Sequence, residues 1–186
     1  MKKYISIIAV AVSGVAFSQV IIGDEEGTAA DKTSVLLEFA EGQNKGLILP
    51  YVTTLPTDDA LVPGVIVLDA TTATAAAVKY YAPGNALADA NGWVNLSNTS
   101  TADVSDELAD QPATTEDTGA KTIIGAATST ADGVLVLEST TKAMVLPTVA
   151  STDDVPDPAP GMMVYINGTN KRLAVFNGLK WTYWKP

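Results

Sequence analysis

The sequence predicts a mainly β chain: two similar small antiparallel β modules in tandem, joined by a polar linker and preceded by a cleaved signal peptide. Three observations support this fold class. The chain starts with a short basic and apolar leader. Short apolar runs bounded by turn residues follow, which is typical of strands. The same runs return in the same order later, which indicates an internal repeat. The expected segments are a signal peptide at 1–18, module 1 at 19–96, a Ser/Thr/Asp-rich linker at 97–121 and module 2 at 122–186.

The leader has the three parts of a secretory signal. Lys2 and Lys3 form its basic start, residues 4–15 are apolar, and Ala16 and Ser18 are small residues at the −3 and −1 positions of a cleavage site. The apolar run is too short to span a bilayer. We therefore expect an exported protein without a transmembrane segment, located in the periplasm, at the outer membrane or on the cell surface.

The repeat consists of six blocks whose order and residue types agree between the two halves. In the first half they cover 21–23, 35–38, 45–52, 63–67, 78–81 and 91–96, and in the second half 123–125, 134–138, 142–149, 160–165, 173–176 and 177–181. So many blocks in one order are poorly explained by chance, which favours a duplicated unit.

Turn and proline positions divide the blocks into strands. Proline cannot donate to a ladder, so Pro50 and Pro147 should end the runs before them. The Pro-Gly pairs at 63–64 and 160–161 are turn dipeptides that should lead into buried strands. Each module is therefore expected to contain four to five short strands, mostly an antiparallel meander.

The strongest local pattern is a hairpin at the end of module 2. Asn177 and Gly178 separate two strand-like runs, which is the signature of a type I′ turn. In module 1 the corresponding hairpin has a longer tip at 82–91, a change that costs little because loop closure depends weakly on length. Within the linker, residues 104–109 are expected to form one helical turn.

These blocks resemble a short repeated β-rich module of Bacteroidota (flavobacterial) surface proteins and of phage tail-fibre-like proteins. The resemblance rests on the Leu-Glu pairs at 37–38 and 137–138, the Lys-x-apolar-Pro segments at 44–50 and 141–147, and the second-half segments 160–165 and 176–181. The first half departs from that pattern at Asp69 and 71–77 and in its enlarged hairpin tip. The resemblance implies fibres, adhesins or envelope-associated proteins, often trimers or larger assemblies, and brings no catalytic residues.

Composition argues against several function classes. The formal charge is −10, and removal of Lys2 and Lys3 leaves nine basic against 21 acidic residues, a charge near −12. Such a chain is not expected to bind nucleic acid, whose affinity depends on basic residues. With no histidine and no cysteine, the usual general base, thiol nucleophile and transition-metal ligands are missing. We therefore expect a protein that is not an enzyme and carries no cofactor.

Calcium is the one ion kept as a candidate, because carboxylates in flexible loops suit it. The candidate ligands are Asp153, Asp154 and Asp157, or Asp89 with Asn91. The candidate contacts to a partner or ligand are the hairpin-tip and aromatic residues Tyr80, Tyr81, Asp89, Asn91, Trp93, Tyr183 and Trp184.

Two functions remain open at this point. The first is a non-enzymatic structural or interaction protein, a self-assembling or envelope-complex subunit of a cell-surface fibre or adhesin-like assembly, whose partners are copies of itself or other envelope proteins. The alternative is a glycan- or surface-binding module that uses the hairpin tip and the C-terminal aromatic residues.

Overall fold

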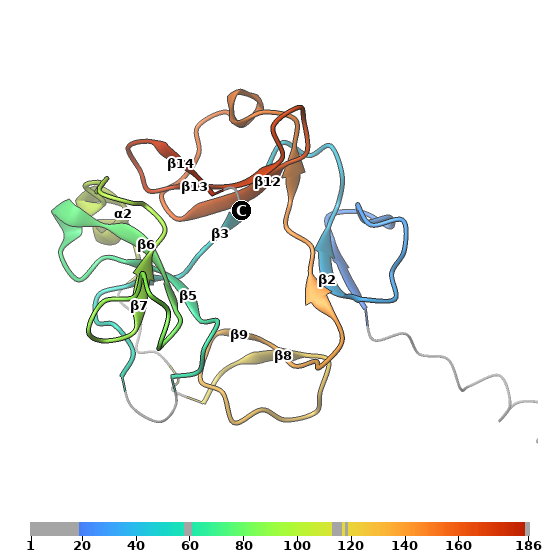
Figure 1. The fold of residues 1–186 in the computed structure, drawn as a ribbon, viewed down its shortest axis with the longest axis horizontal. Helices are drawn as coiled ribbons and strands as arrows, with labels where there is room; N and C mark the ends of the chain where they lie inside the picture. The colour runs from blue at the N-terminus through green and yellow to red at the C-terminus, as the bar shows by residue number, and fades with distance from the viewer. Residues whose placement is uncertain (1–18, 58–60, 113–116, 118, 185–186) are drawn as a thin grey trace, which may run out of the picture.

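The computed structural model describes the chain except for residues 1–18, 58–60, 113–116, 118 and 185–186. The predicted signal peptide therefore lies outside the described residues. Within them the chain is mainly β, which confirms the predicted fold class (Figure 1).

The first half contains seven strands among its described residues and two short helices. These are β1 (Val20–Ile22), β2 (Val35–Phe39), β3 (Leu47–Ile48), β4 (Tyr51–Val52), β5 (Ile66–Asp69), β6 (Ala77–Tyr81), β7 (Trp93–Asn95), the 3-10 helix η1 (Ala73–Ala75) and α2 (Ser105–Ala109). Helix α2 confirms the helical turn expected within residues 104–109.

The second half has strands of the same order and similar length. They are β8 (Thr122–Ile124), β9 (Leu135–Leu137), β10 (Ala143–Met144), β11 (Thr148–Val149), β12 (Met162–Ile166), β13 (Arg172–Phe176) and β14 (Trp181–Trp184), with the 3-10 helix η2 (Thr152–Asp154) between β11 and β12.

Pairing within each half follows the same scheme, but half of it was not predicted. β5–β6–β7 and β12–β13–β14 are antiparallel, as expected from the hairpin signals. β1 with β2, β8 with β9, β4 with β5 and β11 with β12 are parallel, whereas the sequence predicted a mostly antiparallel meander. The long connections at 23–34 and 125–134 allow a parallel return, which a tight turn would not. These returns give the chain stacked, β-solenoid-like coils.

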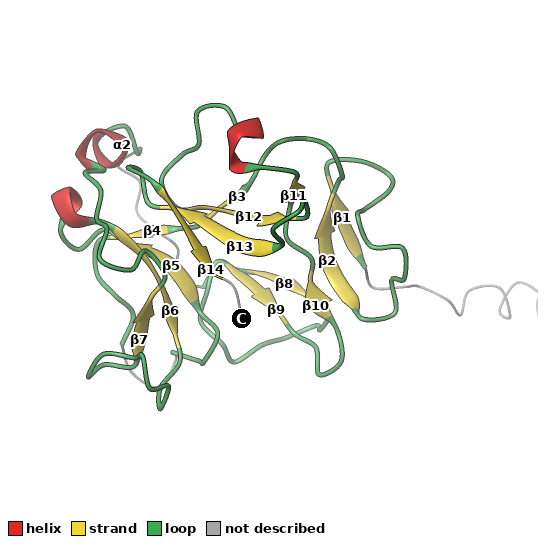
Figure 2. Ribbon diagram, turned by 45° about the horizontal axis from the view of Figure 1, so that its top comes forward, coloured by secondary structure: helices red, strands yellow, loops and turns green. Residues whose placement is uncertain are grey.

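Two short strands cross from one half to the other. β3 of the first half pairs antiparallel with β12, and β10 of the second half pairs parallel with β2. Figure 2 shows β10 beside β2, and β3 beside β12. The two halves therefore share sheets, and each supplies a strand that completes a sheet of the other.

The main core lies between the sheet β4–β7 and the sheet β11–β14, with one apolar face of each sheet turned to the other. Leu68 and Val78 from the first half meet Met163 and Val175 from the second. Val104, from the segment predicted to be a linker, is fully buried in the same core. The other members of this core are Leu49, Ala70, Ala76 and Leu96. Since burial of apolar area drives folding, this shared core joins the two halves into one unit.

A second core covers the opposite face of the sheet β11–β14. Val149, Val155, Met162, Val164, Ile166 and Ala174 form it. Phe176 and Trp181 pack against it with ring centroids 5.3 Å apart. Val155 follows η2, so the loop between β11 and β12 folds over this face.

The first residues of the predicted linker pack against the folded modules. Ala102 bridges to Ala76, and the buried Ser100 hydroxyl accepts a hydrogen bond from the amide of Asn177 at 3.1 Å. These contacts tie residues 97–104 to both halves of the chain.

The hairpin at the end of the second half is present, but its turn is not the predicted type I′. Strand β13 ends at Phe176 and β14 begins at Trp181, so the loop has four residues. Gly178 has a φ of 108°, whereas Asn177 is not among the residues of positive φ. The Asn177 carboxamide oxygen instead accepts the N–H groups of Leu179 and Lys180, both at 3.0 Å. The side chain replaces the backbone bond that a two-residue turn would make.

Gly46 permits the contact of the β3 segment with β12, and this predicts a measurable effect. A Cβ built at Gly46 would lie 2.2 Å from Cγ of Met162 and 3.0 Å from the carbonyl oxygen of Met163. We expect Gly46→Ala to lower the free energy of unfolding by about 1–2 kcal/mol, because the strand must shift or Met162 must leave its place. Chemical denaturation measures this. Gly133→Ala is the matched control, since a Cβ there meets nothing closer than 3.7 Å, and an equal loss in both variants would contradict the prediction.

Candidate functional site

Of the predicted contact residues, the two tryptophans serve the fold. The Trp93 side chain is 3% exposed and packs on the Tyr81 ring at a centroid distance of 5.4 Å. The indole N–H of Trp184 donates to the carbonyl oxygen of Leu96 at 2.6 Å, and its ring packs on the main core. Tyr80 packs against that core as well. None of these rings lies free on the surface.

The carboxylate of Asp89 stabilises the enlarged hairpin tip through hydrogen bonds to the backbone. The Asp89 side chain accepts the N–H groups of Asn91 at 2.9 Å and Trp93 at 3.0 Å. The Tyr80 hydroxyl accepts a hydrogen bond from the Asn85 amide at 3.3 Å. Asp89 and Asn91 are exposed, so the tip is an ordered, solvent-facing loop.

Tyr183 is the exposed aromatic residue of the predicted set, with 42% of its surface accessible. Its hydroxyl is hydrogen-bonded to that of Thr152 at 3.0 Å, and the Arg172 guanidinium lies 3.9 Å from its ring centroid. Tyr183 lies on β14, whereas the other exposed members, Asp89 and Asn91, follow β6. The predicted set is therefore split between two sheets.

The calcium candidates are partly engaged by the backbone. Asp154 accepts the Ser151 N–H at 3.0 Å within a capping box at the start of η2. The Asp89 carboxylate accepts the N–H groups of Asn91 and Trp93. Over the described part of the chain, no cluster of three or more acidic, histidine or cysteine side chains is placed to hold a metal ion. Calcium stays a prediction of the sequence.

Asp69, which lies where the first half departs from the family pattern, forms a partly buried ion pair. Its carboxylate lies 2.7 Å from Nζ of Lys79 and accepts the Thr71 N–H at 3.0 Å. Burial raises the pKa of Asp69, but the Lys79 and Thr71 hydrogen bonds outweigh it and hold the pKa below its ordinary value. The corresponding positions of the second half are Ile166 and Ala174. The pair is a polar substitute for packing and offers no free group to a ligand.

The surface that the predicted list missed consists of apolar strand edges. Ile48 on β3 is 51% exposed, and Leu135 on β9 and the adjacent Val134 are 43% and 62% exposed. Ile22 on β1 is exposed too. We call the outer sides of β3 and β9, away from their partners β12 and β8, the open edges. The sequence did mark these residues, because they belong to the repeated apolar blocks. Their exposure follows from the length of the strands, since strands of two or three residues leave much of their apolar surface uncovered.

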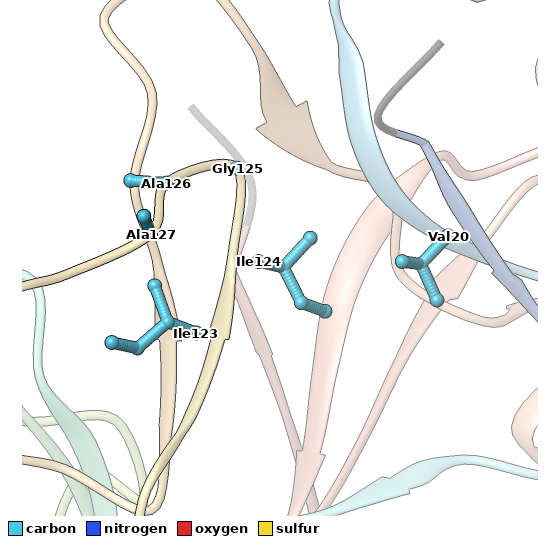
Figure 3. Close-up of a pocket in the computed structure, with 6 residues that line it drawn as sticks. All are labelled: Val20, Ile123, Ile124, Gly125, Ala126 and Ala127. Carbon is cyan, nitrogen blue, oxygen red and sulfur yellow. The ribbon is translucent and has the colours of Figure 1, made fainter. Parts of the chain in front are cut away.

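An open apolar hollow lies between β1 and β8. It has a volume of about 430 Å³ and is lined by Val20, Ile123, Ile124, Gly125, Ala126 and Ala127. Figure 3 shows Ile124 and Val20 facing each other across it from the two strands. Such a lining supplies no acid, base, nucleophile or metal ligand, but it can accept apolar side chains.

Comparisons with known proteins address the second half. Residues 123–186 match a family described as a phage tail-like trimerisation region. This supports the phage tail-fibre-like part of the resemblance, while the likeness to Bacteroidota surface proteins stays a prediction. No curated protein and no solved structure matches the chain. No helix within the described residues is long and apolar enough to cross a membrane. The match indicates self-association through the region that includes β9.

Proposed function

We propose that this chain is an exported, self-associating structural subunit of a fibre-like assembly at the cell surface. The observation that carries the proposal is the match of residues 123–186 to a trimerisation region of phage tail-like proteins. The same half presents Val134 and Leu135 to solvent beside a strand edge that has no partner among the described strands. Natural proteins usually protect such edges, so an exposed apolar one favours pairing with another chain.

The burial pattern supports assembly over ligand binding. The apolar hollow, the open edge of β9 and exposed Ile22 all belong to the coils β1–β2 and β8–β9, which lie outside the main core. Copies of the chain that stack on these coils would cover apolar surface that a monomer leaves in water.

Electron microscopy of the native particle tests the proposal. The protein would be epitope-tagged, cross-linked in its source cells, purified from envelope extracts and labelled with gold through the tag. We expect elongated particles that carry several gold labels and are found on cells as well as in extracts. Recovery of the chain only as single copies, or only inside the cytoplasm, would refute the proposal.

One specific observation favours the alternative function, glycan binding. The Tyr183 ring is exposed, and the Arg172 guanidinium lies over it. A glycan array probed with the wild-type protein and with Tyr183→Ala decides this. Binding that disappears in the variant would favour the alternative, and absence of binding by the wild type would remove it.

A further inference from the structure

The exchange of strands between the two halves uses β3 with β12 and β10 with β2, and it leaves the two equivalent pairings, β10 with β5 and β3 with β9, unused. β2 of the first half has two partners, β1 and β10, whereas its counterpart β9 pairs with β8 alone among the described strands. Met163 in β12 pairs with both Val175 and Leu47. Its counterpart Ile66 in β5 pairs with Tyr80 alone in the described part of the chain. Within the described residues, the second half thus lacks a third strand on β9, and the first half lacks one beside the start of β5.

The strands that could fill these places are present, each with a free side. The N–H groups of Ala143 and Val145 donate to Ser34, just before β2, and to Leu37 in β2, at 2.7 Å each, so the backbone groups of Met144 between them face outward. Leu47 and Leu49 face β12, with the Leu49 N–H donating to Gly161 at 3.2 Å, so the N–H groups of Gly46 and Ile48 face outward.

The two edges that would receive these strands, on β5 and β9, also have backbone groups that face outward. The N–H groups of Leu68 and Ala70 donate to the β4 segment. By alternation, the backbone groups of Ile66 face the same edge of β5, at a point that lies before the residues paired with β4. On β9, Val134 accepts from Thr122, and Glu138 donates to Ile124. The backbone groups of Leu135 and Leu137 therefore face away from β8.

We propose that a second copy of this chain repeats the intrachain exchange. Strand β10 of one copy adds antiparallel to β5 of the next, with Met144 opposite Ile66 and Val145 opposite Val65, as β3 adds to β12. In the same contact β3 of the next copy adds parallel to β9, as β10 adds to β2. The contact is head-to-tail, which closes into a ring when the rotation between copies allows it. The inference rests on the proposed self-association and specifies the strands that carry it.

Side-chain sizes at the proposed contact are compatible with it. Within the chain, Met162 fills the space beside Gly46, and a Cβ there would clash with its Cγ and Sδ. In the proposed contact the incoming strand carries Ala143 in the place of Gly46, and the receiving strand carries the shorter Val65 in the place of Met162. The loss of side-chain length on one strand makes room for the added Cβ on the other.

Disulfide trapping tests the contact. Because the sequence contains no cysteine, every disulfide must form between the introduced residues. A Val65→Cys protein is mixed with a Val145→Cys protein under mild oxidation, so that a disulfide between the two variants must join two copies. Directly opposed residues of antiparallel strands have Cβ atoms about 4.5–5.5 Å apart, within reach of a disulfide. We expect the mixed dimer to form at least about tenfold faster than in a mixture of Leu87→Cys and Leu179→Cys, two well-exposed positions away from the edges.

A proline variant gives a second, independent readout. Met144→Pro removes an N–H that by alternation faces away from β2, so the fold should retain its melting temperature. The proline would block strand addition on that side, and self-association should weaken by about tenfold or more, with Met144→Leu as the matched control. Oligomers that persist while the Val65–Val145 disulfide forms at the control rate, or while Met144→Pro associates normally, would overturn this contact and leave the proposed function standing. A wild-type chain that is monomeric would overturn both.

Discussion

Trp93→Ala is expected to lower the free energy of unfolding by about 4 kcal/mol, the largest loss among the single substitutions considered. The indole is almost fully buried and packs on Tyr81, so its removal leaves a cavity and loses an aromatic pair. Guanidinium denaturation followed by circular dichroism measures the loss.

Two controls make this prediction specific. Trp93→Phe keeps an aromatic ring on Tyr81 and should lose less than half as much. Leu179→Ala removes a side chain that is well exposed and should change the stability little. If Trp93 were a ligand platform, the alanine variant would unfold like the wild type, and that result would contradict the structural role assigned to it.

The second large effect is expected at Glu38, a fully buried carboxylate. It lies 2.5 Å from Nζ of Lys32, accepts the Gln19 side-chain amide at 2.6 Å and the Ala29 N–H at 3.0 Å. Glu38→Ala leaves these donors without their acceptor and should cost about 3 kcal/mol. Lys32 is partly exposed and can turn toward water, which keeps the loss at the lower end for a broken buried pair.

The repeat supplies the matched control for Glu38. Glu138, the corresponding residue of the Leu-Glu block, is only partly buried and accepts a hydrogen bond from the Ser129 hydroxyl. Glu138→Ala should therefore cost about 1 kcal/mol. Equal losses in the two variants would show that burial of Glu38 does not set its contribution.

The same carboxylate predicts how stability changes with pH. Burial raises the pKa of Glu38, but hydrogen bonds from Lys32, Ala29 and Gln19 outweigh it and place the pKa below the ordinary 4.5. The unfolded chain then takes up its proton first as the pH falls. The stabilisation is present above pH 4.5 and is lost as the pH falls through the folded-state pKa. The difference in unfolding free energy between wild type and Glu38→Ala should be constant at neutral pH and shrink in acid, and a constant difference down to about pH 2 would contradict this.

Strand positions were predictable from the sequence, because apolar runs and turn residues mark them directly. The hairpin of β13 and β14, the proline-terminated runs and the helical turn of α2 are confirmed. The pattern failed at Asn177, where the side chain closes the turn and the backbone does not need a positive φ at that residue. Asn-Gly therefore located the turn correctly but not its type.

Strand partners could not be predicted in the same way. β3 and β10 are two residues long, too short for an apolar period to show which face or edge they join. Both pair with residues far away in the chain, and parallel returns such as β1 to β2 carry no turn signature. The burial of the candidate contact residues could not be predicted for a related reason. An aromatic residue in a short strand has the same sequence pattern whether it covers a core, as Trp184 does, or faces solvent, as Tyr183 does.

The mass of the purified protein in solution tests the central claim most directly. Size-exclusion chromatography with light scattering, repeated across a range of concentrations and salt, compares the particle mass with the mass of the purified chain, which is 19.3 kDa when all 186 residues are present. A self-associating subunit predicts a discrete multiple of the mass of the purified chain, with three copies expected from the match of residues 123–186. A well-folded protein that keeps the mass of one chain at every concentration would contradict the account.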